Sequence, residues 1–331
     1  MAKRAPVGET SVMVRTPEMI AAVEAGNWDV VLRAVADAMA PHRGQGAVAT
    51  YIPALARVNP MHFGLALTTC EGEISGVEDC DVPFSVQSVS KVFSLMLALN
   101  EVGDAIWDRV GREPSGSAFN SVVQLEAESG IPRNPFINAG ALVVTDILVE
   151  RLGVNGTLQH IEQTMRELSG NPNVRFDEEV AISEAACGHR NASLAHFMKS
   201  FGALKSRVDD VLHVYFRQCS LSMNASDIAQ ASLWLANDGK QPRTGKQIVS
   251  RERARRINAL MLTCGHYDAA GDFAFRVGLP GKSGVGGGIV VVVPDRLTAV
   301  VWSPGLNRHG NSHVGTLALE AFVDLTGLSI L

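Results

Sequence analysis

The segments with strand character lie near the two ends of this chain, and a long helical block separates them. Residues 63–69 and 72–79 read as a hairpin over the Glu71-Gly72 turn, and residues 286–304 hold two β-branched runs around Pro294-Asp295. Strands so far apart are most economically paired in one shared sheet. We therefore expect an α/β (α+β) fold, in which the first and last helices pack on an antiparallel sheet and the helical block is an insertion.

Helical periodicity dominates residues 88–280. The first helix is expected over residues 17–40, after the capping pair Thr16-Pro17, and the last over residues 313–327. Six segments between them mostly end in glycine and are expected to be helices: 88–103, 138–153, 191–202, 206–219, 226–239 and 250–265. This order predicts a sheet domain (residues 1–87 and 266–331) and a mainly helical domain (residues 88–265), with the active site between them.

Composition and charge narrow the class of protein further. The 331 residues are 46% hydrophobic and 19% charged, which is typical of a globular protein. The formal net charge of −5 requires no basic face, so nucleic acid is not an expected partner. The apolar runs fall far short of the ~20 residues that span a bilayer, and none follows the basic N-terminal residues as in a secretory signal. The short apolar runs therefore indicate no membrane partner. Five dispersed cysteines without a C-x-x-C pair indicate a reduced, cytoplasmic protein.

Two short motifs contain residues that could take part in catalysis. Ser88 and Lys91 form an S-x-x-K at an expected helix start, which places both side chains on one face. A lysine that is kept neutral can accept the serine proton, although a serine that merely caps the helix fits the same spacing. Lys282-Ser283-Gly284 leads into a strand and matches the other half of the serine–lysine acyl-transfer signature. The two motifs in this order favour an acyl-transfer enzyme.

A phosphate-binding loop is the rival interpretation of the lysine in Lys282-Ser283-Gly284. That loop needs a glycine where Arg276 stands and a helix afterwards, whereas a β-branched run follows. A metal site is not expected either, because Gly310-Asn311 breaks the helix that would align His309 with His313. We therefore expect neither a metal nor an organic cofactor.

Two further sequence patterns each allow either a catalytic or binding role or a helix-capping role. Ser222-Met223-Asn224 matches the S-x-N motif of penicillin-recognising enzymes, but Asn224 or Ser226 is equally well placed to cap a helix. Glu184 lies in the mostly apolar stretch ISEAACG, where it either caps a helix start or offers a carboxylate to an ammonium group.

Six blocks of the chain resemble those of the serine-dependent, bacterial-type glutaminases. They are FSVQSVSKVF (84–93), GREPSGSAFNS (111–121), PRNPFINAGAL (132–142), ISEAACGHRN (182–191), TCGHYDAAGDFA (263–274) and GLPGKSGVGGGI (278–289). The resemblance runs from about residue 63 to 311, roughly three quarters of the chain. Departures from the family pattern are His266 where methionine is common, Arg133 where a small or apolar residue is common, and Cys80 where glycine is common.

The resemblance implies a β-lactamase/transpeptidase-like fold and an amidohydrolase that converts L-glutamine to L-glutamate and ammonia. It implies Ser88 as nucleophile, Lys91 as general base and Tyr215 near the leaving nitrogen. Because the family's third catalytic position is a tyrosine, Ser222-Met223-Asn224 is expected to be incidental. The resemblance also implies seven substrate contacts: Ser88, Asn138, Glu184, Asn191, Tyr215, Tyr267 and Val285.

These residues make a coherent mechanism. Ser88 would attack the amide carbon, with its own backbone N–H and that of Val285 forming the oxyanion hole. Lys91 would accept the hydroxyl proton, and Tyr215 would help return a proton to departing ammonia. A γ-glutamyl ester would remain for water to hydrolyse. Lys282-Ser283-Gly284 would support the site, its lysine supplying positive potential that helps keep Lys91 neutral.

The remaining residues would hold the α-amino acid group of glutamine. Glu184 would pair the α-ammonium, while Asn138, Asn191 and Tyr267 would bond the α-carboxylate. L-glutamine is thus the expected small-molecule partner, and a homodimer or homotetramer is expected by analogy.

Two other functions stay open at this point. A penicillin-binding-type serine hydrolase or esterase of the same fold would use Ser222 and Asn224. A binding module that had lost catalysis would lack one of Ser88, Lys91 or Tyr215, and all three are present.

Overall fold

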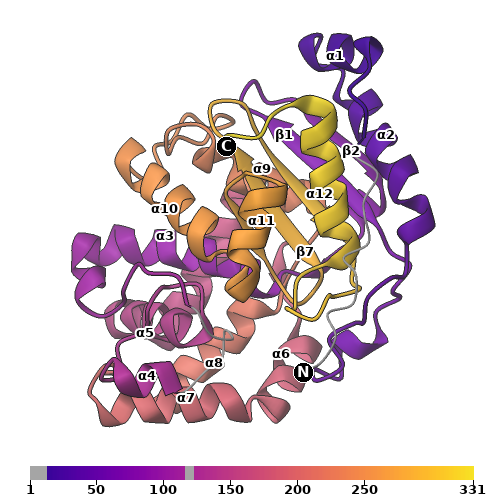
Figure 1. Cartoon of the computed structure of the whole chain (residues 1–331). Helices are drawn as coiled ribbons and strands as arrows, with labels where there is room; N and C mark the ends of the chain where they lie inside the picture. Colours follow the sequence, from indigo (N-terminus) through magenta and orange to yellow (C-terminus); the bar gives the residue numbers. More distant parts are fainter. Residues whose placement is uncertain (1–12, 116–122) are drawn as a thin grey trace.

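A computed structural model of the chain describes residues 13–115 and 123–331. At its centre lies a five-stranded antiparallel sheet in the order β2-β1-β8-β7-β6 (Figure 1). Its strands are β1 (Gly64–Thr69), β2 (Ile74–Glu78), β6 (Gly281–Ser283), β7 (Gly288–Val293) and β8 (Leu297–Trp302). The first strand pairs with the last, from Gly64 opposite Trp302 to Thr69 opposite Leu297. This pairing confirms that both ends of the chain share one sheet.

The described residues also form α-helices and a second, small sheet. The helices are α1 (Pro17–Glu24), α2 (Trp28–Met39), α3 (Ser90–Val102), α4 (Val123–Ala127), α5 (Asn138–Ser169), α6 (Glu178–Cys187), α7 (His189–Ser200), α8 (Val208–Cys219), α9 (Ala225–Ser232), α10 (Arg251–Cys264), α11 (Ala270–Arg276) and α12 (His313–Thr326). The small sheet has the order β3 (Phe84–Ser85), β5 (Leu221–Met223) and β4 (Arg175–Phe176).

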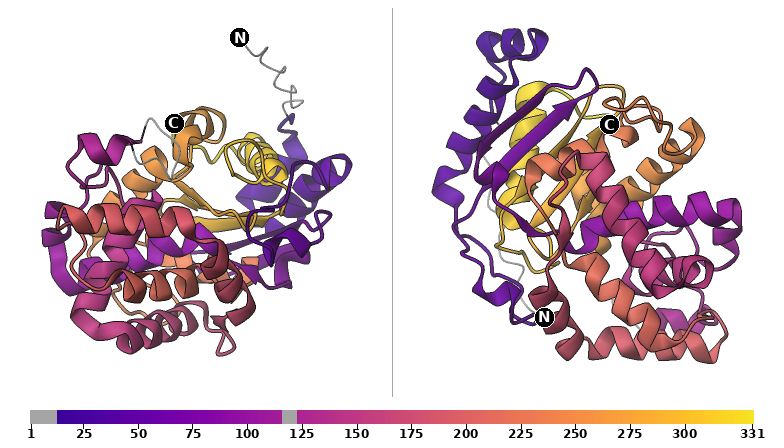
Figure 2. Two further views of the ribbon diagram at one scale, coloured as in Figure 1. Left: turned by 90° about the horizontal axis from the view of Figure 1, so that it is seen from below. Right: turned by 180° about the vertical axis from the view of Figure 1, so that it is seen from behind.

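Helices cover both faces of the central sheet (Figure 2). Leu65 and Leu67 of β1 pack into the core beneath α2 and α12, whereas Ala66 packs into the core shared with the helical block. The same alternation divides β7, where Val291 faces the first core and Val290 the second. Because both faces are buried, these strands are nearly continuous apolar runs, unlike strands with one wet face.

Glycines explain two differences from the expected helices. The 17–40 segment is two helices, with Gly26 at a φ of +68° between them, although Thr16 caps the first by accepting from the Met19 amide. The expected 138–153 helix meets Gly153 at a φ of +70°, then resumes and runs on to Ser169 as α5. Glycine enters this left-handed region without steric cost, so it interrupts or ends helices.

Three helices and the small sheet have no counterpart among the expected elements. In α6 the first turn depends on Asp177, whose side chain accepts from the amides of Glu179 and Val180. The other two helices are the short α4 and α11, and the strands of the small sheet span two or three residues each. Elements this short carry too few residues for a periodic pattern to stand out.

Within the two described ranges, no helix has both the length and the apolar character needed to cross a membrane. The interpretation of residues 1–12, and that of the GREPSGSAFNS block from residue 116 onward, concern residues outside these ranges.

Candidate active site

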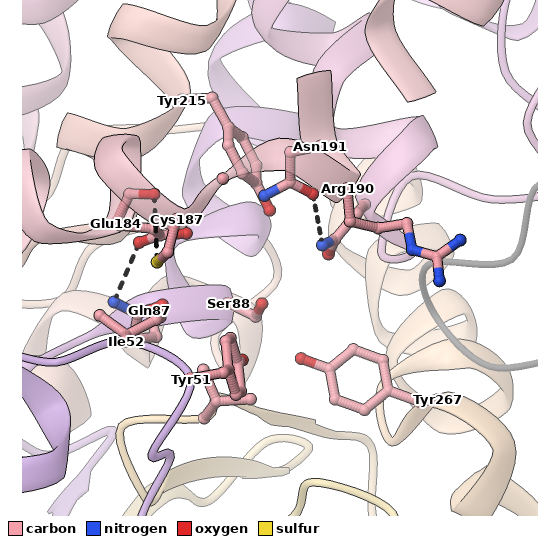
Figure 3. A pocket seen from close by; sticks show the side chains of 13 residues that line it. Tyr51, Ile52, Gln87, Ser88, Glu184, Cys187, Arg190, Asn191, Tyr215 and Tyr267 are labelled. Atoms are coloured by element: carbon pink, nitrogen blue, oxygen red, sulfur yellow. Dashed lines mark hydrogen bonds between the residues drawn. The ribbon is translucent and has the colours of Figure 1, made fainter. Parts of the chain in front are cut away.

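One cavity of about 170 Å³ gathers the residues that the sequence analysis singled out (Figure 3). It lies where the turn after β6 meets the start of α3 and the helices α5 to α8. Its wall consists of Tyr51, Ile52, Gln87, Ser88, Asn138, Glu184, Cys187, Gly188, Arg190, Asn191, Tyr215, Tyr267 and Val285. All the residues expected to contact substrate therefore line the same cavity.

Ser88 occupies a tight turn directly before α3. Gln87–Val89 form a 3-10 helix, so Ser88 precedes α3 and does not cap it. Gln87 has a φ of +51°, and its side chain holds the turn by donating to Ser85 Oγ at 3.0 Å. Backbone strain of this kind is common where a protein aims a functional side chain. The phenol of Tyr267 points towards Ser88 across the cavity (Figure 3).

Lys91 is buried on the first turn of α3. Its Nζ donates to the Phe136 carbonyl at 3.1 Å and to Asn138 Oδ1 at 2.7 Å. Burial lowers the pKa of Lys91 to about 8, so the neutral amine that a general base requires is accessible near neutral pH. Burial is the leading cause of this shift, and burial followed by the Lys91 charge holds the pKa of Lys282 well below its usual value. The expected contribution of Lys282 to the neutrality of Lys91 stays a prediction.

The PRNPFINAGAL block supplies both hydrogen-bond acceptors of Lys91 Nζ. Asn134 Oδ1 accepts from the amides of Phe136 and Ile137 at 3.0 and 3.1 Å, which curls the chain ahead of α5. This turn presents the Phe136 carbonyl to Lys91. A Cβ at Gly140 would lie 1.8 Å from the Asn134 carbonyl oxygen, so only glycine fits where α5 crosses the turn.

A chain of side-chain amides connects Lys91 with the far wall of the cavity. Asn138 accepts from Lys91 and donates through Nδ2 to Asn191 Oδ1 at 2.9 Å (Figure 3). Because its oxygen is taken by an amine, the orientation of the Asn138 amide is determined. Residues from α3, α5 and α7 are thereby held in one network.

Glu184 offers a buried carboxylate to the cavity. It is 7% exposed, and its Oε2 accepts from Gln87 Nε2 at 3.3 Å. Burial raises the pKa of Glu184 to about 7, an effect that the Gln87 hydrogen bond and the Lys91 charge partly offset. The capping interpretation of Glu184 is wrong, because it lies within α6 and Asp177 is the capping residue.

The two predicted tyrosines keep their protons. Burial raises the pKa of Tyr215 well above its usual value. Burial also raises the pKa of Tyr267, whose ring lies 4.4 Å from Lys282 Nζ. A protonated phenol can donate a hydrogen bond to a substrate.

Lys282-Ser283-Gly284 lies on β6 and the turn after it, and another strand follows. The phosphate-loop interpretation is therefore wrong, since it requires a helix at that point. Lys282 Nζ donates to the carbonyls of Gly265 and Ser283 at 3.1 and 2.5 Å. A Cβ at Gly284 would lie 3.2 Å from the Ser88 amide nitrogen, so this turn closely approaches the backbone of Ser88.

Other candidate residues lie elsewhere. Asn224 caps α9 in a capping box with Asp227, and Ser222 pairs with Ser85 and Arg175 in the small sheet. His309 contacts Asp268 at 3.0 Å, whereas His313 begins α12. Among the described residues, no cluster of three or more His, Cys, Asp or Glu side chains could hold a metal ion.

Gln87 and Tyr51 belong to the cavity wall but carried no signal in the sequence analysis. Gln87 is adjacent to Ser88, so a search of the residues flanking the nucleophile would have found it. Tyr51 precedes β1 and reaches the cavity only through the path of a connecting segment, which no local pattern predicts.

The sheet, its covering helices and the two motifs meeting at Ser88 define the β-lactamase/transpeptidase-like class of folds. The family model for Glutaminase matches residues 46–331, and the chain belongs to this family.

Relatives and solved structures agree with this assignment. A glutaminase of Sinorhizobium fredii is 57% identical over 292 residues, which cover 88% of this chain and 93% of that protein. The crystal structure of a probable glutaminase from Bacillus subtilis has a TM-score of 0.85 at 34% identity, covering 92% of this chain and 98% of that one. A further solved structure shows a Bacillus subtilis glutaminase in covalent complex with 5-oxo-L-norleucine, formed by reaction with 6-diazo-5-oxo-L-norleucine. Its TM-score is 0.81 at 34% identity, covering 92% of this chain and 99% of that one. The family resemblance and the expected fold are confirmed.

Proposed function

We propose that this protein hydrolyses L-glutamine to L-glutamate and ammonia through a γ-glutamyl ester on Ser88. The observation that carries the proposal is the cavity in which Ser88 shares one wall with the buried carboxylate of Glu184 and the amides of Asn138 and Asn191. The covalent complex of the Bacillus subtilis glutaminase, described above, supports a nucleophilic side chain in that related protein.

Acylation begins when Ser88 Oγ attacks the side-chain carbonyl of glutamine. The backbone amides of Ser88 and Val285 stabilise the oxyanion, a role supported by the close approach of Gly284 to the Ser88 amide. Lys91 accepts the serine proton; catalytic hydrogen bonds of this kind commonly form only once substrate is bound. Lys91 then passes this proton to the leaving ammonia with the help of Tyr215, whose phenol keeps its own proton at neutral pH.

Water then hydrolyses the γ-glutamyl ester, with Lys91 acting again as base. During both steps the α-ammonium of the substrate pairs with ionised Glu184, and Asn138, Asn191 and Tyr267 bond the α-carboxylate. Gln87 keeps the Glu184 carboxylate in place through its side-chain amide. Such positioning at both ends places the amide carbon close to Ser88 Oγ.

No observation favours the alternative of a penicillin-binding-type hydrolase or esterase. Its S-x-N residues serve structural roles, because Asn224 caps α9 and Ser222 lies in the small sheet.

We also propose the wider setting of the enzyme. The sheet domain (1–87 and 266–331) and the helical domain (88–265) enclose the active site, to which they contribute Val285 and Asn138, for example. The protein acts in the cytoplasm, which is consistent with its five free cysteines, and as a homodimer or homotetramer. Light scattering after size exclusion tests the oligomeric state.

The decisive experiment measures ammonia release from L-glutamine by purified protein with nothing added. A Ser88→Ala variant prepared in parallel reports contaminating activity. Turnover by the wild-type protein that the variant lacks supports the proposal, and equal release by both proteins, or none by either, overturns it.

A further inference from the structure

We propose that Trp302 is a positioning residue for this reaction, because its indole holds the turn that carries the Val285 amide. The inference rests on the proposed function, in which the Val285 and Ser88 amides stabilise the oxyanion. Trp302 ends β8 and is buried, and it is not among the described residues that line the cavity. Its effect on the reaction is therefore exerted through the backbone of the turn.

The turn between β6 and β7 aims the Val285 amide. The Gly287 amide donates to the Gly284 carbonyl at 2.9 Å and closes a β-turn, with Val285 at its first central position. A trans peptide group points its N–H opposite to its carbonyl, so the Val285 N–H is directed out of the turn. Within the described part of the chain no backbone carbonyl accepts from this N–H, and Val285 lines the cavity.

Such a turn needs restraint from outside. Residues 284 and 286–288 are all glycine, the residue with the widest choice of backbone conformations. One restraint is packing, since a Cβ at Gly284 would lie 2.8 Å from the Val86 carbonyl oxygen. Two hydrogen bonds add to it: the Ser303 amide donates to the Gly287 carbonyl at 3.0 Å, and Trp302 Nε1–H donates to the Gly286 carbonyl at 3.0 Å, one residue beyond Val285.

Trp302 also contacts the segment that leads to Ser88. The ring of Phe84 stacks on it with centroids 4.8 Å apart and an interplanar angle of 5°. Phe84 begins β3, four residues before Ser88. His62 stacks on the indole as well, with centroids 4.8 Å apart. One side chain therefore connects the two backbone segments that carry the oxyanion donors, and it acts together with the direct packing of the glycine turn on the Val86 carbonyl to fix their separation.

The test is Trp302→Phe, which keeps an aromatic ring in the stack but removes the N–H donor. Loss of a whole oxyanion donor costs about 10²- to 10³-fold in kcat. Because the Val285 amide would be displaced and not deleted, we expect kcat to fall by about tenfold or more. KM for glutamine should stay within about twofold, since the α-groups are held by residues outside this turn.

Partial misfolding would also lower kcat at constant KM, so the competent sites must be counted. Exhaustive labelling with 6-diazo-5-oxo-L-norleucine, read by intact mass, gives the fraction of sites with a working nucleophile, and kcat is expressed per labelled site. The matched control is His62→Leu, which removes a stacking ring and the 2.8 Å contact from His62 Nδ1 to Asp79 but leaves the indole N–H bond intact. We expect its kcat per labelled site to stay within about twofold of wild type.

Three outcomes overturn the inference. They are a Trp302→Phe kcat per labelled site within twofold of wild type, a rise in KM at unchanged kcat, and an equal loss in His62→Leu, which would indicate packing alone. Failure of the proposed function is seen separately, as the absence of ammonia release by the wild-type protein, and it would overturn this inference as well.

Discussion

Glu184→Gln tests how the site recognises the α-ammonium group of its substrate. The Glu184 carboxylate is 7% exposed and faces the cavity from α6. Burial raises its pKa to about 7, so close to neutral pH the carboxylate exists in both protonation states. Only the ionised form pairs with an ammonium group. The binding of glutamine should therefore weaken as the pH falls through this pKa.

Two groups then shape the acid side of the pH profile. Glu184, with a pKa of about 7, and Lys91, with a pKa of about 8, must both lose a proton before the enzyme is competent. Between pH 7 and 8, kcat/KM should rise about tenfold per pH unit. Below pH 7 it should rise about 100-fold per unit, because two protons have to leave; the two pKa values belong to the interacting pair.

In the Glu184→Gln variant only the deprotonation of Lys91 should shape the acid side of the profile. Its kcat/KM should change by about tenfold per pH unit at all acidic pH values. Because the Glu184 charge raises the pKa of Lys91, the midpoint should also move to lower pH. At pH 9, loss of a charge-assisted hydrogen bond worth about 1.5–3 kcal/mol should reduce kcat/KM by about 10- to 150-fold.

The assay is the initial rate of ammonia release at low glutamine concentration from pH 5.5 to 9. Glu179→Gln is the matched control, since that carboxylate lies on the same helix with its side chain 69% exposed. Its profile should equal that of wild type. The reasoning is refuted if Glu184→Gln retains the two-proton slope, or if its kcat/KM at pH 9 lies within about threefold of wild type.

Four further outcomes are expected. Ser88→Ala should fold normally and lose about 10⁴-fold or more in kcat; ammonia release above a tenth of wild type would exclude Ser88 as nucleophile. Lys91→Arg should be nearly as inactive as Lys91→Ala in that assay, because arginine stays protonated, and an active arginine variant would mean that the lysine acts only as a charge. Asparagine, one methylene shorter, should have a kcat/KM at least about 10²-fold below that of glutamine; values within threefold would withdraw the α-group contacts. His266→Met should raise Tm more at pH 5 than at pH 8. Burial and then the Lys282 charge hold the pKa of His266 well below its usual value. The unfolded chain binds a proton below about pH 6.5 that the folded chain refuses, so stability falls by about 1.4 kcal/mol per pH unit there, and methionine abolishes this loss; equal gains in Tm at both pH values would contradict the argument.

The sequence by itself determined the features that depend on near neighbours along the chain. The cap at Thr16, the hairpin of β1 and β2, and the strands around Pro294-Asp295 all lie where the pattern predicts them. Local spacing also places Ser88 and Lys91 one turn apart at the start of α3. Such features are predictable because capping bonds, turns and side-chain periodicity involve residues only a few positions apart.

Tertiary structure alone decided the electrostatics of the site and several of its contacts. The pKa of Lys91 and that of Glu184 shift towards each other because both groups are buried, and burial is a property of the packed fold. Gln87 meets Glu184 across 97 positions of sequence. The turn that contains Val285 receives a hydrogen bond from Trp302, a residue of β8, at the Gly286 carbonyl. No local pattern encodes these distances, since they arise only when the sheet and the helical block close around one cavity.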